Sequence, residues 1–245
     1  MTEPSSFNHL TAIKVTTLAM SHGKQFTLYS HHGGPNGWKV AFLLEELALT
    51  YETKYLDFPA GEHKAAEYLK INPNGRIPAL VDHKNDDYTI WESDAILLYL
   101  VDKYDTEKKF TVTEEGDKYH LIQWLFFQAS GQGPYYGQAT HFMKYHPERV
   151  QSAIDRYKDE VRRVLGVLET VLSKQEWLVG GKYTIADLSF VSWNVALSGA
   201  TFTKEDPSFN WKKEYPSVAK WHDTMRERLA MKKCFEIHAQ LVASQ

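Results

Sequence analysis

The chain has 245 residues, 43% of them hydrophobic and 13% aromatic, which is enough to bury the core of one large domain or two small ones. Its 28 Lys and Arg residues stand against 31 Asp and Glu residues, a net charge of -3, which argues against nucleic acid or an anionic membrane surface as a partner. The single cysteine, Cys234, excludes an internal disulfide and a Cys-X-X-Cys pair. No apolar run approaches the roughly 18 residues of a membrane span and no secretory signal is evident, so we expect a cytoplasmic protein whose residues 1–22 form a loose tail.

The first hundred residues predict an alternation of strands and helices. Apolar and polar side chains alternate in residues 26–29 as in a strand, and the polar, glycine-rich residues 30–37 then form a loop. From Trp38 the apolar side chains recur at helical spacing. The expected elements are a strand at 26–29, a helix from 38, a strand at 51–57, a short helix at 63–69, strands at 77–82 and 88–91, and a helix at 94–104. The order is therefore β-α-β-α-β-β-α.

Turns and side-chain spacing add detail to this first half. Pro78 cannot donate to a sheet ladder, so we expect it at the first residues of a strand or on a free edge, where its peptide bond can also adopt the cis form. The polar residues 83–87 predict a hairpin turn, which makes the two strands beside it antiparallel. On the last helix of this half we expect Ala95, Leu98 and Val101 to face inward.

Beyond a charged linker the strand signals stop and helical patterns take over. Residues 151–172 place apolar side chains three and four apart, as a helix with a buried stripe does. Thr184 and Asp187 form a capping box, in which each side chain accepts from the other residue's backbone N–H, so a further helix begins there. We predict an α/β domain over residues 23–105 and an all-α domain over residues 116–245.

Four stretches give the chain a resemblance to a known family. They are residues 30–40 (SHHGGPNGWKV), 72–81 (NPNGRIPALV), 90–93 (IWES) and 183–188 (YTIADL). Over residues 24–235 the chain resembles the cytosolic glutathione transferases, most of all the fungal class typified by the yeast nitrogen-catabolite regulator that forms a prion. The resemblance implies a thioredoxin-like first domain that holds glutathione, a helical second domain that lines the pocket of an apolar cosubstrate, and a homodimer.

The start of the first helix, Pro35-Asn36-Gly37, carries no cysteine where thioredoxin-like redox proteins keep theirs, so the thiol must come from a ligand. A helix N-terminus stabilises a thiolate through its free N–H groups and its dipole. The serine of the larger transferase classes would fall at Gly33, and the resemblance implies that the Asn36 amide donates to sulfur instead. Asn36 as an ordinary helix N-cap is the alternative interpretation, and Ser30 and Tyr29 are other candidate donors.

The resemblance also implies contacts for the rest of glutathione. Ser93 and Glu92 take the carboxylate and the ammonium of the γ-glutamyl end, where a helix start binds negative charge. The backbone of Ile77 pairs with the cysteinyl amide, and His63 meets the glycyl carboxylate. Arg156 is a candidate for a second glutathione carboxylate. The ordinary alternatives are a serine N-cap, an exposed helix histidine and a solvated or ion-paired arginine.

Two further patterns concern the cosubstrate and metal. Residues 124–137 are aromatic and glycine-rich, which suits the wall of an adaptable apolar pocket as well as core packing. The histidines have no partners at metal-ligand spacing, so we expect no metal.

The reaction that the resemblance implies starts from a bound glutathione thiolate. It either conjugates a small hydrophobic electrophile, as in detoxification, or exchanges with a disulfide or reduces a peroxide. The alternative is a non-catalytic glutathione-binding regulator or ligand carrier, because the best-known relative in this class acts by binding a transcription factor. That relative has a long Asn-rich extension, whereas only one asparagine, Asn8, precedes Gln25 here, so a prion-forming role has no support.

Overall fold

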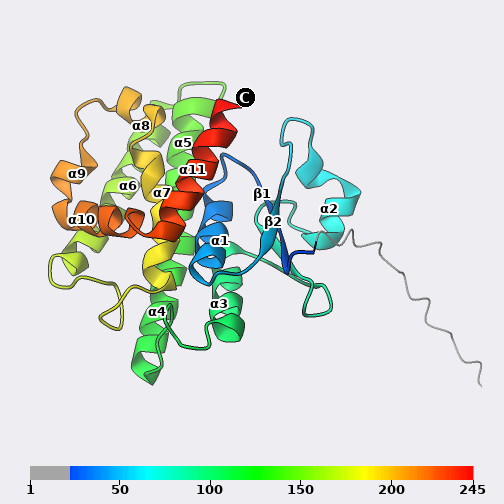
Figure 1. Ribbon diagram of the computed structural model, residues 1–245. Coiled ribbons are helices and arrows are strands. Elements are labelled where there is room, and N and C mark those ends of the chain that lie inside the picture. The colour runs from blue at the N-terminus through cyan, green and yellow to red at the C-terminus, as the bar shows by residue number, and fades with distance from the viewer. Residues whose placement is uncertain (1–22, 245) are drawn as a thin grey trace, which may run out of the picture.

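The computed structural model describes residues 23–244, so the expected tail at 1–22 lies outside the described residues. The first part of the chain is a sheet with three helices (Figure 1). Its elements are β1 (Phe26–Ser30), α1 (Pro35–Glu46), β2 (Tyr51–Tyr55), η1 (Glu62–Lys64), α2 (Ala66–Ile71), β3 (Ala79–Asp82), β4 (Tyr88–Trp91) and α3 (Ser93–Tyr104). Apart from the 3-10 turn η1, the order is β-α-β-α-β-β-α, and the predicted α/β fold is confirmed.

The four strands form a mixed sheet in the order β2-β1-β3-β4. Strands β1 and β2 run parallel, and β3 runs antiparallel to both β1 and β4, so the predicted hairpin is confirmed. The Ile77–Pro78 peptide bond is cis, as expected. Pro78 precedes the first residue of β3, so its missing N–H interrupts no ladder bond. This places the cis bond at the sheet end from which α1 also starts.

The rest of the chain is helical. Its elements are α4 (Glu115–Phe127), the π-helical η2 (Gln128–Gln132), α5 (Gly133–Thr140), the π-helical η3 (His141–Tyr145), α6 (Gln151–Leu172), α7 (Ile185–Leu197), α8 (Ala200–Glu205), α9 (Trp211–Glu214), α10 (Pro216–Arg226) and α11 (Leu229–Ala243). The predicted stripe of α6 is confirmed, with Ile154, Val161 and Leu165 among its buried side chains. No helix among residues 23–244 is long and apolar enough to cross a membrane.

Helix α7 begins with the predicted capping box. The Thr184 hydroxyl accepts from the Ala186 N–H at 3.2 Å, and the Asp187 carboxylate accepts from the Thr184 N–H at 2.9 Å. The same carboxylate accepts from the Leu178 N–H and from the Trp221 indole N–H, at 2.9 and 3.0 Å. The start of α7 is therefore tied to α10 and to the loop before it.

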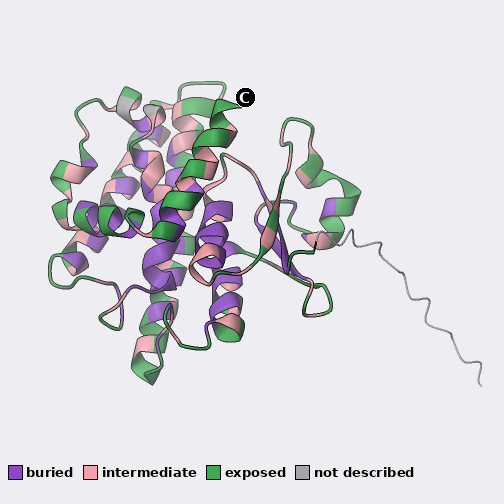
Figure 2. Cartoon of the chain, viewed as in Figure 1, coloured by how far each residue is buried: buried purple, intermediate pink, exposed green. Residues whose placement is uncertain are grey.

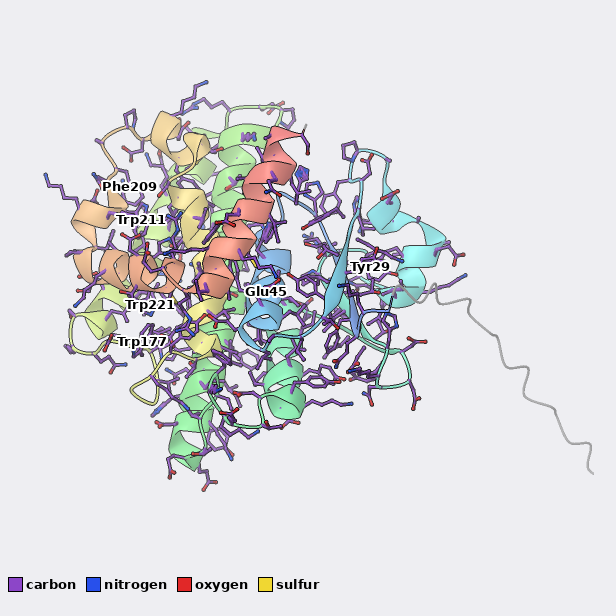
Figure 3. The ribbon with its side chains drawn as sticks, in the orientation of Figure 1. Tyr29, Glu45, Trp177, Phe209, Trp211 and Trp221 are labelled. Atoms are coloured by element: carbon purple, nitrogen blue, oxygen red, sulfur yellow. The ribbon has the colours of Figure 1, made fainter. Side chains whose placement is uncertain are left out.

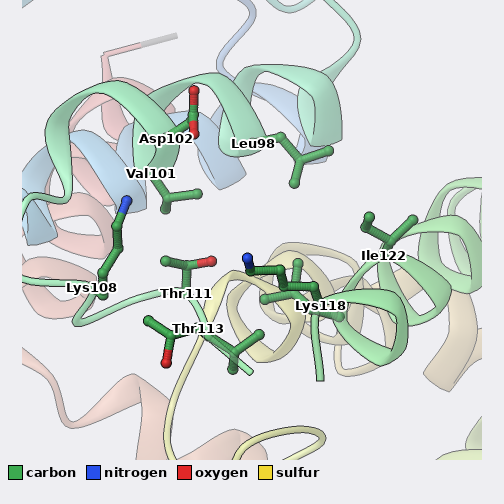
Figure 4. A pocket seen from close by; sticks show the side chains of 10 residues that line it. Leu98, Val101, Asp102, Lys108, Thr111, Thr113, Lys118 and Ile122 are labelled. Atoms are coloured by element: carbon green, nitrogen blue, oxygen red, sulfur yellow. The ribbon is translucent and has the colours of Figure 1, made fainter. Parts of the chain in front are cut away.

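The inward face of α3 is in part the one expected. Val101 is buried as expected, together with Ile96, Leu97 and Leu100, whereas Ala95 is half-buried and Leu98 is exposed. Helix α3 packs on α1, and that contact selects the face, which the spacing of apolar residues on a helix this hydrophobic does not determine. Leu98 lies instead beside a cavity of about 360 Å³ between α3 and α4 (Figure 4).

Helix α1 joins the two parts of the molecule. It contacts β1 and α3 on one side and α7 and α11 on the other, and α11 crosses in front of it (Figure 1). Figure 2 shows buried residues along α1, the inner strands and the middle of α7. Side chains from the first strand to the last helix belong to one core, so the start of α1 is reached by residues from both parts of the chain.

Candidate functional site

The start of α1 is an uncapped helix N-terminus. Gly34 is its N-cap, and no side chain accepts from the first N–H groups of the helix. Pro35 follows at the first helical position, where its missing N–H is tolerated. Asn36 lies inside the first turn, so its interpretation as the N-cap is wrong. The Trp38 indole N–H donates to the His32 carbonyl at 2.8 Å and holds the loop that leads into the helix. Such an end offers free N–H donors and a positive dipole to an anion.

The Asn36 side chain is oriented by a residue of the helical part. Its Oδ1 accepts from the Nε1–H of Trp193 on α7 at 2.9 Å. Among residues 23–244, no hydrogen bond uses its NH2 group. A primary amide carries two N–H donors, so Asn36 can still donate to a ligand at the helix start.

The two other candidate donors point elsewhere. Ser30 is buried, and a Cβ atom on Gly37 would lie only 1.9 Å from its Oγ, so this hydroxyl sits beneath the first turn of α1. The Tyr29 ring contacts the Tyr68 ring at a centroid distance of 5.5 Å, on the α2 side of the sheet (Figure 3). The Ser30 hydroxyl therefore lies against the first turn of α1, the Tyr29 side chain lies toward α2, and Asn36 is itself in the first turn of the helix.

Ile77 lies against the same helix start. A Cβ atom on Gly34 would be 2.7 Å from the Ile77 Cδ1, so the two residues are in direct contact. The preceding carbonyl, that of Arg76, accepts from the Tyr68 hydroxyl at 2.6 Å and from the Asn72 amide at 2.7 Å. Within the described part of the chain, the backbone of Ile77 takes part in no hydrogen bond. Its N–H and C=O are therefore available to an extended ligand beside α1.

The start of α3 presents Glu92 and Ser93. Glu92 is the N-cap and has φ of 71°, a value that non-glycine residues adopt rarely and that concentrates at functional sites. Ser93 is therefore not the N-cap, and that alternative is wrong. Its Oγ accepts from the Lys39 ammonium at 3.1 Å, which leaves the hydroxyl hydrogen free to donate. The two side chains suit an amino acid end group that carries both charges.

Lys39, which sequence reasoning missed, lies fully buried beneath this helix start. Its ammonium also donates to Asp94 Oδ1 at 3.1 Å and to Gln128 Oε1. Burial lowers the pKa of Lys39, and the Asp94 carboxylate opposes that shift. The bonds continue from Gln128 to Gln132 and from there to Asn194 on α7, at 2.9 and 2.8 Å. The only sequence signal was a lysine inside an apolar helix.

His63 and the loop before α1 are joined by a row of rings. Phe58 stacks between His63 and His31, with both centroid distances 4.3 Å. The Gly33 N–H donates to His31 Nδ1 at 3.1 Å, which requires that nitrogen to be unprotonated, and burial lowers the pKa of His31. His63 is half-buried and its Nδ1 has no partner among the described residues. A ligand carboxylate could satisfy that nitrogen.

Arg156 is exposed on α6, whose main packing partners are α5 and α10. The structure does not bring it to the start of α1, and its contact with a second glutathione carboxylate stays a prediction.

An apolar cavity of about 250 Å³ adjoins the helix start. It is lined by His32, Gly33, Pro35, Trp38, Phe42, Ser192, Val195, Ala196, Gly199, Phe235 and His238. These residues come from the start of α1 and the loop before it, from α7 and Gly199 just beyond it, and from α11. Residues 124–137 do not line this cavity, and their place in the wall of a cosubstrate pocket stays a prediction. Within this range, Gln128 and Gln132 lie in the π-helical segment η2, and both side chains are buried in the core. Across residues 23–244 no cluster of three or more His, Cys, Asp or Glu could hold a metal.

Comparisons with known proteins agree with this architecture. Residues 24–102 match the family model of the glutathione S-transferase N-terminal domain, and residues 134–228 match that of the C-terminal domain. The chain therefore belongs to the glutathione S-transferase family.

Within the family the chain is similar to several fungal proteins, among them proteins named URE2. Glutathione S-transferase 2 of Schizosaccharomyces pombe is 54% identical, covering 86% of this chain and 95% of that protein. The transcriptional regulator URE2 of Saccharomyces cerevisiae is 39% identical, covering 93% of this chain and 72% of that protein. The crystal structure of glutathione transferase URE2P6 from Phanerochaete chrysosporium in complex with oxidized glutathione is 60% identical, with a TM-score of 0.86, covering 90% of this chain and 99% of that chain.

Proposed function

We propose that this protein is an enzyme that binds glutathione and uses its thiolate as a nucleophile. The observation that carries the proposal is the uncapped start of α1 with the unengaged NH2 group of Asn36 beside it. An anion placed there gains the helix dipole, the backbone N–H of Asn36, which donates to no partner among the described residues, and one side-chain amide donor. The complex of the URE2P6 relative with oxidized glutathione supports glutathione as the ligand.

The proposed binding mode extends from α1 to α3. The cysteinyl amide pairs with the backbone of Ile77, and the γ-glutamyl end lies at Glu92 and Ser93. The glycyl carboxylate accepts from the Nδ1–H of His63, a nitrogen that has no other partner among the described residues. Arg156 is proposed to bind the carboxylate of a second glutathione. The cosubstrate occupies the apolar cavity beside α1, so the glutathione site belongs to residues 23–105 and the cosubstrate site draws on residues 116–245.

Two reactions follow from one bound thiolate. In conjugation the sulfur forms a bond to an electrophilic carbon and the leaving group departs with its electron pair. In thiol-disulfide exchange the sulfur attacks a disulfide, one thiolate leaves, and a second glutathione resolves the mixed disulfide to oxidized glutathione. Neither needs a protein cysteine, in keeping with the burial of Cys234, which raises the pKa of its thiol to about 12. Neither needs a metal, and we propose that none is bound.

Asn36→Ala tests the proposal. Turnover of a chlorodinitrobenzene acceptor or of hydroxyethyl disulfide is expected to fall about ten- to a hundredfold, the effect of about 1.4 to 2.8 kcal/mol of lost anion stabilisation. Titration of the ultraviolet absorbance of bound thiolate should show its pKa rising by about one to two units. Glutathione affinity by calorimetry should change less, because the other contacts remain.

Ser30→Ala and Tyr29→Phe are the controls for a hydroxyl donor: the Ser30 hydroxyl lies against Gly37 in the first turn of α1, and the Tyr29 ring lies against Tyr68. If either control shifts the titration while Asn36→Ala leaves it in place, the donor is a hydroxyl. If the wild-type protein turns over no electrophile, disulfide or peroxide, it is not an enzyme of this kind.

A non-catalytic regulator is the second candidate, and the 39% identity to the transcriptional regulator URE2 favours it. It predicts stoichiometric recovery of a transcription factor from lysate by a protein that turns over no thiol substrate.

We also propose a cytoplasmic homodimer that pairs through β4, α3 and α4. Tyr88 and Trp91 on the edge strand, Leu98 on α3, and Tyr119 and Phe126 on α4 are exposed apolar side chains, with exposed fractions from 36% to 68%. The cavity between α3 and α4 lies beside this face (Figure 4). Apolar side chains gathered on one face are typical of subunit interfaces.

A further inference from the structure

The hydrogen bond between Trp193 and Asn36 determines which way the asparagine amide points. The two residues are 157 positions apart, and the bond spans 2.9 Å from α7 to α1. An indole N–H can only donate, so the amide atom that faces it must be the oxygen. The NH2 group then lies in the amide plane on the opposite side of Cγ from the oxygen, and it faces away from the indole N–H.

The orientation matters because the two ends of the amide have nearly the same shape and opposite polarity. Turned by half a rotation, Asn36 would present a carbonyl oxygen to an anion and repel it. Packing alone distinguishes the two ends poorly, whereas a hydrogen bond to a donor-only partner distinguishes them well.

We propose that Trp193 is a positioning residue that holds the Asn36 amide so that its NH2 group donates to the glutathione sulfur. The proposal rests on the function proposed above for Asn36. It makes the basicity of the bound thiol a property of both parts of the molecule: α1 supplies the donor and α7 sets its direction.

The indole is itself held in place by α5. A Cβ atom on Gly133 would lie 3.6 Å from the indole Nε1, and one on Gly137 would lie 3.5 Å from Cη2 at the other end of the ring. Glycines four residues apart share one face of a helix, so the ring lies along a strip of α5 without side chains. The ring position therefore depends on both glycines.

A second link keeps α7 at a constant distance from α1. Asn194, next to Trp193, accepts from Gln132, and Gln132 is bonded through Gln128 to Lys39, one helical turn beyond Asn36. All four side chains are buried, and the hydrogen bonds between them lie in a low-dielectric interior where such bonds are strengthened. The bond from Trp193 to Asn36 is thus made between two helices that are already fastened together.

The test is Trp193→Phe, which removes the indole donor and keeps an aromatic ring against α5. The pKa of bound glutathione, read from the ultraviolet absorbance of the thiolate, is expected to rise by about half a unit to one unit, less than in Asn36→Ala because part of the population keeps the donating orientation. Turnover should fall about three- to tenfold at saturating substrates, with the KM for glutathione changed less than about twofold.

Trp211→Phe is the matched control. It also loses an indole N–H to side-chain oxygen bond, to Ser198 at 3.2 Å, and leaves α1 untouched. Its thiolate pKa is expected to equal that of the wild type. The double variant Asn36→Ala/Trp193→Phe should titrate like Asn36→Ala alone, because Trp193 acts only through Asn36.

Additive shifts in the double variant, or a wild-type pKa in Trp193→Phe, would overturn the role of Trp193 while the proposed function stands. An unchanged pKa in Asn36→Ala would instead remove the proposed role of Asn36. If Trp193→Phe does not fold, Gly137→Leu takes its place: it keeps the indole but presses on it from α5. An upward shift of the thiolate pKa in that variant supports the proposal, and a wild-type value contradicts it.

Discussion

Ser93 shows how one side chain can serve the fold and a ligand together. Its oxygen accepts from the buried Lys39 ammonium, so the hydroxyl is oriented with its hydrogen pointing away from the core. It lies in the first turn of α3, where the free N–H groups favour a carboxylate. Glu92, held at positive φ beside it, supplies a negative charge for the ammonium of the γ-glutamyl end. The buried ammonium of Lys39 thus preorganises the proposed γ-glutamyl site without contacting the ligand itself.

Ser93→Ala is expected to weaken glutathione binding about tenfold or more, because a hydrogen bond to a carboxylate contributes about 1.5 kcal/mol or more. Calorimetry measures the affinity, and the turnover at saturating glutathione should be nearly unchanged because the sulfur site is intact. Ser130→Ala is the control, since that exposed hydroxyl bonds only the Phe126 carbonyl. Equal affinities in the two variants would contradict the assignment.

At the scale of an element, α7 carries the most dependencies. The capping box fixes the first turn of α7, and its third turn places Trp193 against Asn36. Most of its residues are buried in the core. Any loss of order at its start is transmitted along a rigid helix to the candidate site. The capping residue Asp187 is therefore a structural residue whose loss is also expected to disturb the position of Trp193 at the candidate site.

Asp187→Ala is expected to lower the free energy of unfolding by about 3 kcal/mol or more. It strands three buried donors, the Leu178 N–H, the Thr184 N–H and the Trp221 indole, and each unsatisfied donor costs about 1 to 3 kcal/mol. Urea unfolding measures the change. Asn210→Ala, which removes the side-chain cap of the short helix α9, should cost only about 1 kcal/mol. Similar losses in both variants would show that Asp187 acts as a simple cap.

At the scale of the whole molecule, the two parts of the chain share one core around α1, and five large exposed apolar side chains lie on β4, α3 and α4. The first arrangement makes the protein unfold as a unit, and the second provides the proposed subunit interface. Both are open to measurement.

Leu98→Glu is expected to convert the proposed dimer to a monomer, because it places a charge in an apolar interface. Light scattering at micromolar concentration reads the mass directly. Leu229→Glu is the matched control, since Leu229 is 86% exposed on α11, away from that face. A wild-type protein with the mass of one chain would refute the dimer.

The stability should also depend on pH through His222 on α10. Burial lowers the pKa of this imidazole to about 3, with Arg226 and Lys212 acting in the same direction and Asp223 against it. The folded state therefore favours neutral His222, so stability is lost as pH falls below the unfolded pKa of 6.5 toward 3. Between pH 7 and pH 5 this residue alone should lower the free energy of unfolding by about 2 kcal/mol. His222→Phe should flatten the measured pH profile by that amount; parallel profiles would disprove it.

The sequence by itself determined the features that depend on near neighbours in the chain. The β-α-β-α-β-β-α order, the stripe of α6 and the capping box of Thr184 and Asp187 follow from spacings of two to four residues. The position of Pro78 just before a strand follows from what a proline cannot do in a sheet. Each of these was expected and each is present.

The tertiary structure decided what depends on distant partners. The amide of Asn36 is oriented by a residue 157 positions away, and Lys39 meets Gln128 across 89 positions. Ala95 and Leu98 were wrongly predicted to face inward from α3 for the same reason. Which side chains meet across these distances is set by how α1 packs on α3, α7 and η2, and local spacing contains no information about helix packing.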